Sequence, residues 1–431
     1  MDSTWSQTVQ LPKFDPLPST LSTDVLVIGG GMAGLLCAYQ LARAGVDYAL
    51  LEADRVGGGI TKNTTAKITV QHGLIYDKLI REFGTERARL YLEANQAALA
   101  QYRALCRDIP CDFEVKASYV YSTDDRGKLD RELNALNRLG FPAEFVSDLP
   151  LPFPVAGAIK WSGQAQFHPL KFAAAIAKDL RIFERAKVLE LAPHRAVTTA
   201  GTVLADNIIV ATHFPMLNKH GGYFLKLYQH RSYVLALKNA PNVDGMYLGA
   251  DKNGLSFRNY HDLLLLGGGG HRTGRKGAGW RELEQFARRH YPDAREAARW
   301  ATQDCMTLDG IPYVGPYSRR TTGLYVASGF NKWGMTSSMA AATLLTDLIL
   351  GRENPYAAVF SPARTMLRPQ LAVNGWESAL GLLTPTVPRC PHMGCALKYN
   401  AAEHSWDCPC HGSRFEEDGT LIDNPATGGK R

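Results

Sequence analysis

Two short segments near the end of the sequence carry thiol and imidazole side chains at spacings that suit a metal centre. The segments 390–395, CPHMGC, and 408–413, CPCHGS, together read Cys-x-His, fifteen residues, Cys-x-x-His. Two thiolates and two imidazoles can hold a tetrahedral zinc ion or an iron–sulfur cluster whose two irons take different ligands. On either interpretation the predicted metal ligands are Cys390, His392, Cys408 and His411.

The distribution of the cysteines favours a metal centre over a disulfide framework. The chain has eight cysteines, and four of them lie between Cys390 and Cys410. The other four are scattered, as is typical of core or surface thiols, and the first residues lack the features of an export signal. We therefore expect a reducing, cytoplasmic location.

The spacing of the four ligands, together with CPCHGSRF, resembles the Rieske family. The resemblance implies a 2Fe-2S cluster with both thiolates on one iron and both imidazoles on the other, at about −150 to +300 mV. It also implies a disulfide between Cys395 and Cys410 and a hydrogen bond from Ser413 toward the cluster. Rieske domains usually have several strands before the first ligand loop, but here only a short segment separates the flavoprotein from Cys390. We therefore expect this small unit to pack against the flavoprotein or another subunit.

A second pattern with chemical meaning lies near the start of the sequence. The apolar run DVLVIGGG leads directly into MAGLLCAYQLARAG, whose apolar residues recur at helical spacing. The turn between them carries G-x-G-x-x-G at Gly29, Gly31 and Gly34, and a second strand ends at Glu52. Such glycines allow a tight turn, close approach of a pyrophosphate and close helix packing, while the acid accepts ribose hydroxyls. The pattern predicts a dinucleotide site.

The segments that follow resemble the D-amino-acid oxidase superfamily, which includes glycine and sarcosine oxidases. They are ADRVGGGITKNTTAKITVQHG, the pair RIFERAKVLEL and TVLADNIIVATH, and GLYVASGFNKWGMTSSMAAATLLTDLILG. They occur in family order over about 24–362 and imply that the dinucleotide is FAD. The predicted FAD contacts are Gly29, Gly31, Met32, Ala33, Gly34, Glu52, Ala53, Thr61, Thr64, Lys67, Val188, Ala211, Thr212, Gly329, Trp333, Gly334, Met335 and Thr336.

Two further segments bear on the cofactor. Some sarcosine oxidases attach FAD to a cysteine, but Cys305 is displaced from that position, so we expect noncovalent FAD. The glycine run in 263–280 lacks the following apolar helix and the acid of a second nucleotide site. We expect it in the substrate sheet, and we expect the basic run 271–276 to be a solvated loop.

The predicted fold is an α/β, Rossmann-like, doubly wound FAD domain interleaved with an antiparallel-sheet α+β substrate domain, followed by a small all-β Rieske subdomain. An N-terminal extension, 1–22, precedes the interleaved domains, 23–365, and a linker, 366–386, leads to the Rieske subdomain, 387–431. The predicted FAD parts are 23–111, 179–212 and 316–365, and the substrate parts are 112–178 and 213–315.

The substrate domain is expected to position an unprotonated amine over the flavin and exclude water, without a strong acid or base. An arginine there can clamp a substrate carboxylate. No residue is assigned as catalytic. The candidate substrate contacts are His72, His168, Tyr228, His230, Arg231, Arg258, His271, Lys332 and Trp333.

These resemblances favour an FAD-dependent dehydrogenase that oxidises a C–N bond of a small amine or amino acid. Electrons would leave singly through the cluster to a protein or quinone. Two alternatives stay open: a reductase or electron-transfer protein that exchanges electrons with a partner through the cluster, and a redox sensor. A Rieske oxygenase is disfavoured because the sequence offers no convincing second iron site.

Composition excludes some partners and leaves one question open. The net charge of +7 is spread along the chain without a nucleic-acid-binding motif, so we expect no nucleic-acid partner. The longest apolar stretch, 335–350, is too short and polar to cross a bilayer, so we expect no membrane span. The sequence does not determine the oligomeric state, and a homo-oligomer is one of the open alternatives.

Overall fold

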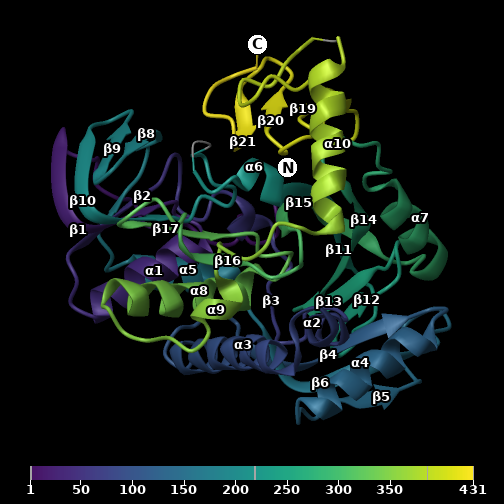
Figure 1. Ribbon diagram of the computed structural model, residues 1–431. Coiled ribbons are helices and arrows are strands. Elements are labelled where there is room, and N and C mark those ends of the chain that lie inside the picture. The colour runs from purple at the N-terminus through teal and green to yellow at the C-terminus, as the bar shows by residue number, and fades with distance from the viewer. Residues whose placement is uncertain (1, 218–219, 386, 431) are drawn as a thin grey trace.

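The computed structural model describes residues 2–217, 220–385 and 387–430. They form two large sheets and one small sheet, and Figure 1 shows the small sheet, drawn in yellow, beside helix α10 (Pro369–Leu383). Other helices include α2 (Tyr76–Phe83), α3 (Thr85–Leu105), α4 (Arg126–Arg138), α6 (Tyr223–Lys226), α7 (Arg281–His290) and the 3-10 helix η1 (Ile60–Asn63).

The first sheet is the predicted doubly wound one, with strands in the order β16-β17-β10-β1-β2-β7. These strands are β1 (Thr20–Ile28), β2 (Tyr48–Leu51), β7 (Ile182–Phe183), β10 (Thr202–Val210), β16 (Tyr313–Pro316) and β17 (Leu324–Ser328), joined by β8 (Val188–Ala192) and β9 (Arg195–Thr198). Strands β1, β2, β7, β10 and β17 run parallel. The helices after β1 and β17 are α1 (Met32–Arg43) and α8 (Gly334–Ile349).

The register of this sheet brings three strand ends together. Ile28 pairs with Leu51 on one side and with Val210 on the other. The residues that follow, Gly29, Glu52 and Ala211, therefore leave the sheet at one edge. The carboxyl edge of a parallel sheet is where such folds bind ligands.

The second sheet has nine strands, in the order β15-β11-β14-β13-β12-β4-β6-β3 with β5 paired to β6, and is antiparallel except between β4 and β12. Its strands are β3 (Lys67–Ile68), β4 (Glu114–Ser122), β5 (Glu144–Val146), β6 (Gly157–Gln166), β11 (Leu227–Lys238), β12 (Met246–Gly249), β13 (Ser256–Tyr260), β14 (Leu263–Arg272) and β15 (Arg295–Thr307). The glycine run is β14, inside this sheet as predicted. Strand β16 lies in the first sheet, so the boundary expected at 315 falls within a strand.

The third sheet is antiparallel, in the order β18 (Lys398–Asn400), β19 (Ser405–Asp407), β20 (Arg414–Glu416) and β21 (Leu421–Asp423). Its buried core is small and contains four cysteines beside Leu397, Phe415 and Ala426. The segment expected as a linker contains helix α10 (Pro369–Leu383). A Cβ at Gly381 of α10 would lie 2.6 Å from Cys410 Sγ, so the helix packs directly on this unit.

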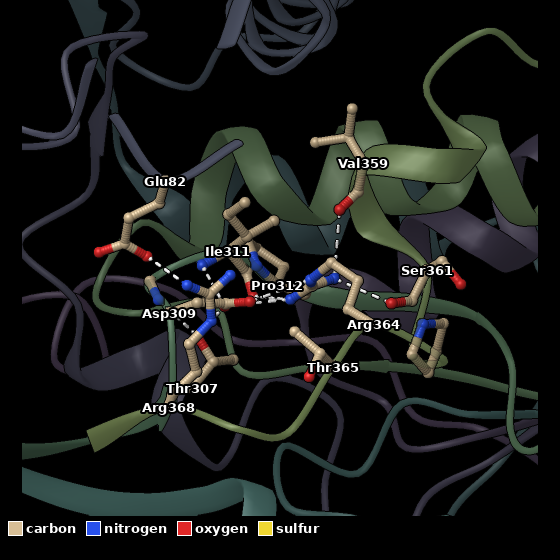
Figure 2. Close-up of polar contacts among 12 residues, drawn as sticks. Glu82, Thr307, Asp309, Ile311, Pro312, Val359, Ser361, Arg364, Thr365 and Arg368 are labelled. Carbon is tan, nitrogen blue, oxygen red and sulfur yellow. Dashed lines mark hydrogen bonds and ion pairs between the residues drawn. The ribbon is translucent and has the colours of Figure 1, made fainter. Parts of the chain in front are cut away.

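A buried arginine fixes the chain between α9 (Ala357–Phe360) and α10. Arg364 pairs with Asp309 at 3.0 and 3.1 Å and donates to the backbone carbonyls of Ile311, Pro312, Val359 and Ser361, as Figure 2 shows. Both side chains of the ion pair are almost fully buried. The planar guanidinium is what lets one side chain reach so many acceptors.

We expect Arg364→Lys to lower the free energy of unfolding by about 2 kcal/mol, because lysine keeps the charge but loses most of the carbonyl contacts. Denaturant unfolding checks this value. Arg43→Lys is a matched control, because Arg43 lies exposed on α1 and makes a 3.3 Å hydrogen bond to Tyr39. Equal effects of the two variants would contradict a special role for Arg364.

None of the helices among the described residues has the length and apolar character needed to cross a membrane.

Candidate functional site

A cavity of about 1280 Å³ opens at the carboxyl edge of the first sheet and extends to the second. Most of the predicted FAD contacts line it: Gly29, Gly31, Met32, Ala33, Glu52, Ala53, Thr61, Thr64, Lys67, Val188, Ala211, Thr212, Trp333, Gly334 and Met335. The structure places Gly34, Gly329 and Thr336 outside this lining. The glycine turn and the segment after β17 thus meet at one elongated space.

Each glycine of the turn is needed for a different structural reason. Gly29 has φ of +111°, and a Cβ there would lie 2.6 Å from the carbonyl oxygen of Ala211. A Cβ at Gly34 would lie 1.8 Å from the carbonyl oxygen of Gly29, which explains why Gly34 supports the turn from behind. At Gly31 the nearest atom is Thr61 Oγ1 at 3.5 Å, so this backbone is open to the cavity.

We expect Gly34→Ala to lower the flavin content of the purified protein at least about tenfold, because the β1–α1 turn must move to relieve the contact. Flavin absorbance per chain measures this. Gly375→Ala is the matched control, since no atom lies within 4 Å of a Cβ at that position. Full flavin content in Gly34→Ala would show that this turn does not bind the pyrophosphate.

Glu52 lies where a ribose-binding acid is expected. Its carboxylate accepts hydrogen bonds from the backbone N–H of Gly30 at 2.7 Å and of Asp54 at 2.9 Å. Burial raises the pKa of Glu52, and these two N–H donors act against that rise. The acid is therefore held in one orientation at the cavity wall.

Four of the candidate substrate contacts line the cavity: His230, His271, Lys332 and Trp333. Burial lowers the pKa of His230 to about 3, so its ring is neutral near pH 7. Lys332 is exposed to the cavity, but desolvation by the surrounding residues lowers its pKa, and its Nζ donates to Ser232 Oγ at 3.1 Å. These residues bring two imidazoles, one indole and one lysine amine to the part of the cavity next to the second sheet.

The other candidates lie behind the cavity wall and have structural partners. His72 stacks on Trp333 with ring centroids 4.8 Å apart and contacts Tyr91 Oη at 2.7 Å. Burial lowers the pKa of His72 to about 3. His168 contacts Thr8 Oγ1 at 2.8 Å and accepts from the backbone N–H of Lys171, as the N-cap of α5 (Pro169–Ala177).

Three further candidates are also held away from the cavity lining. Arg258 donates to the carbonyls of Thr65 and Ala66 at 2.7 and 2.9 Å, so it supports the loop before β3. The Tyr228 ring lies under the guanidinium of Arg272, 4.9 Å from its centroid. Arg231 forms an ion pair with Glu403. The carboxylate clamp that an arginine offers is thus occupied within the chain for Arg231.

The sequence candidates missed two titratable residues beside Lys332. Asp304 of β15 and His213 after β10 both line the cavity. Burial raises the pKa of Asp304, and Lys332, His213 and Arg231 oppose that rise. The only sequence signal for Asp304 is alternation along β15, because Thr302 lines the cavity two residues earlier.

Lys67 lies at the cavity wall, as expected for a cofactor contact. Its Nζ donates a hydrogen bond to Ser256 Oγ. Burial lowers the pKa of Lys67 to about 7, and the nearby charge of Arg258 adds to this effect. A side chain in this state can donate or accept a proton near neutral pH.

The two motif loops of the small unit face each other. Backbone hydrogen bonds close each loop, from Gly394 N–H to Cys390 at 2.9 Å and from Gly412 N–H to Cys408 at 2.9 Å. Cys395 and Cys410 form a disulfide with Cα atoms 6.7 Å apart. The Sγ atoms of Cys395, Cys408 and Cys410 lie within 4.8 Å of one another. The disulfide therefore joins the loops beside the predicted ligands.

The predicted ligand set suits a metal cluster. The rings of His392 and His411 have centroids 4.8 Å apart. Burial lowers their pKa values, to about 4 and about 3, so both imidazoles are in the neutral form that binds metal. Among the described residues, no side chain or backbone group satisfies either ring nitrogen of buried His411 with full hydrogen-bond geometry. An imidazole in this state fits a metal ligand.

Charged and polar contacts hold this unit on the second sheet. Glu403 accepts from Arg231 of β11 at 3.1 Å and from Arg414 of β20 at 2.8 Å. Gln303 of β15 donates to the carbonyl of Gly412 at 2.9 Å. The unit expected to need a supporting surface thus finds it within the same chain.

The basic run 271–276 is part of this contact. Arg272 donates to the carbonyl of Pro409 at 3.3 Å, and Arg275 pairs with Glu377 of α10. Thr273 is buried and donates to Gln303 at 2.9 Å. The expectation of a solvated loop is therefore wrong for the middle of this run, because it is covered by the small unit formed by residues 387–430, here called the motif unit.

The motif unit also completes the cavity wall. Residues 421–427 line the cavity, and Asn424 donates to the carbonyls of Thr212 and Phe214 at 2.6 and 2.9 Å. The ring centroid of buried Phe214 lies 6.4 Å from the ring centroid of His392 and 6.2 Å from that of His411. One aromatic side chain therefore lies edge-on to both predicted histidine ligands, and its neighbour His213 lines the cavity.

Residues 24–348 match the family described as FAD dependent oxidoreductase, and residues 373–429 match the Rieske [2Fe-2S] domain. The chain belongs to the FAD dependent oxidoreductase family. This Rieske-bearing flavoprotein binds FAD, for which the cavity offers the glycine turn and Glu52, and a 2Fe-2S cluster, for which the two loops offer buried thiols and imidazoles. Gly31 fits the FAD pyrophosphate because its backbone is open to the cavity.

Curated relatives and solved structures agree with this assignment. The flavoprotein is 34% identical to YhfW of Bacillus subtilis, described as a Rieske 2Fe-2S iron-sulfur protein, over 98% of this chain and 95% of that protein. It is 25% identical to the gamma-glutamylputrescine oxidoreductase of Escherichia coli, over 78% and 86% of the two chains. Glycine oxidase from Geobacillus kaustophilus has the same fold, with a TM-score of 0.68, 21% identity and coverage of 80% and 100%.

Proposed function

We propose that this flavoprotein oxidises a C–N bond of a small amine or amino acid and passes the electrons singly through its cluster to a protein or quinone acceptor. FAD, when bound, supplies acceptance of a hydride, and the cluster supplies single-electron transfer. The observation that carries the proposal is the position of Phe214, which lies edge-on to both predicted histidine ligands while His213 lines the cavity.

The cavity residues support an amine substrate. The carboxyl group of Asp304 at the cavity wall offers a partner for a substrate ammonium, and Lys332 lies nearby with its pKa lowered by desolvation. Lys332 Nζ in its neutral form can accept the proton that the substrate nitrogen must lose before hydride transfer. The Trp333 ring, held by stacking on His72, gives this part of the cavity an aromatic wall.

The relatives support the same substrate class. The Escherichia coli relative is named a gamma-glutamylputrescine oxidoreductase, and the solved structures with this fold include a glycine oxidase and an L-proline dehydrogenase. Each of these names a compound with an amine nitrogen. The ligand loops pack directly on the flavoprotein, which supports transfer of single electrons to the cluster in place of direct transfer to oxygen.

Anaerobic mixing of the holoprotein with a panel of amines and amino acids tests the proposal. We expect one class to bleach the flavin absorbance, followed by reduction of the cluster. The Cys390→Ala variant should show flavin bleaching alone. If no amine bleaches the flavin while NADH or a reduced ferredoxin does so rapidly, the proposal is wrong and a reductase function is favoured.

A further inference from the structure

Helix α10 has its polar and apolar faces reversed relative to an ordinary surface helix. Its buried residues are Asn374, Glu377 and Gly381. Asn374 accepts from Arg272 and Glu377 pairs with Arg275, so the inward face is held by polar contacts. The apolar side chains of the helix point to solvent, although a surface helix usually turns them to the core.

The exposed apolar side chains form a regular stripe. Val373, Trp376, Leu380 and Leu383 follow one another at intervals of three, four and three residues, and their exposed fractions are 44%, 65%, 45% and 80%. Alternating intervals of three and four residues are the spacing of a helix seam that packs on another helix. An exposed contiguous apolar stripe of this kind marks an interaction site.

We propose that a second copy of this chain covers the stripe, so that α10 pairs with α10 across a two-fold axis. The only charged residue in Pro369–Leu383 is Glu377, which is turned inward. The chain as a whole carries a net charge of +7, so two copies approach at least electrostatic cost where the surface is uncharged. A two-fold contact requires a self-complementary surface, and an uncharged stripe of seam residues meets that requirement.

Residues beside the helix extend the contact. Leu367 and Val387 flank the two ends of α10 and have exposed fractions of 85% and 81%. A stable interface buries at least about 1,000 Å² in total, which a single short helix reaches only with such neighbours. The inner face of α10 contacts the cluster loops through Gly381, so the interface lies about one helix diameter, roughly 10 Å, from the cluster.

Sedimentation velocity of the holoprotein over a range of micromolar concentrations tests the proposal. We expect wild type to sediment as a dimer. We expect Trp376→Glu to weaken the dimer at least about tenfold, because an aromatic side chain that the dimer contact buries is replaced by a charged one. Trp376→Leu keeps an apolar seam residue and should stay dimeric. Flavin and cluster spectra of each variant establish that it is folded.

Val115→Glu is the matched control. Val115 is 58% exposed and lies on β4, away from α10 in Figure 1, so its variant should sediment as wild type. A wild-type protein that remains a monomer at all these concentrations would overturn the proposal. Binding of a redox protein to α10 of such a monomer would not rescue it, because the stripe would then serve a different partner. A dimer that Trp376→Glu leaves intact would overturn it as well, because another surface would then form the contact.

Discussion

Replacing Cys390 by alanine is expected to remove the iron from the protein and with it the absorption and paramagnetic signals of the cluster. A Rieske cluster needs both thiolates on one iron, so the loss of either one leaves that iron without its ligand set. FAD should remain, because the glycine turn and Glu52 belong to the first sheet and not to the motif loops. Iron and flavin per chain, measured on the same sample, check both parts.

Cys106→Ala is the control for this result, because Cys106 is a buried free thiol at the end of helix α3 and lies outside the motif loops. It should keep both iron and flavin. If Cys390→Ala retains iron and the cluster spectrum, the ligand assignment is wrong. If metal analysis of wild type finds one zinc ion in place of two irons, the zinc interpretation of the motif replaces the cluster.

Glu403→Ala should loosen the motif unit from the flavoprotein. The change removes the ion-pair partner of the buried Arg231 guanidinium, whereas Arg414 keeps Asp407 and Asp423. Removing one partner of a buried ion pair costs about 3–5 kcal/mol, because the remaining charge is left without compensation in a poorly solvated place. We expect a loss of this size in the free energy of unfolding of the motif unit. Denaturant unfolding monitored by the circular dichroism of the cluster measures this loss.

Asp47→Ala provides the comparison with an exposed ion pair. Asp47 accepts from Arg181 at 2.8 Å, and the two side chains are 52% and 42% exposed. Solvent screens such a pair, so the expected loss is below about 1 kcal/mol. Similar losses for Glu403→Ala and Asp47→Ala would show that the buried network does not hold the motif unit in place.

Local patterns in the sequence were enough to predict the two cofactor-binding segments. The glycine turn depends on residues within one strand–turn–helix unit, so Gly29 and Glu52 could be assigned from spacing alone. The cluster motif likewise depends on two short loops, and the pairing of Cys395 with Cys410 follows from the family pattern. In both cases the chemistry is encoded within a few residues of the chain.

Residues whose role depends on distant partners could not be predicted in this way. Arg231 looks like a substrate clamp in the sequence, but its partner Glu403 lies 172 residues further along. Asp304 lies in the middle of a strand, and only the order of the second sheet turns it toward the cavity. The outward apolar face of α10 was also hidden, because its spacing is the same for an inward and an outward face.

The contact between Asn424 and Thr212 has a consequence for how the holoprotein is assembled during synthesis. These residues are 212 positions apart, and residues 421–427 form part of the cavity wall. A ribosome releases the glycine turn and the first sheet long before it releases this segment, so the cavity stays open on that side during most of translation. Closure of this side of the cavity is therefore a late step of maturation, which follows synthesis of the glycine turn and the first sheet.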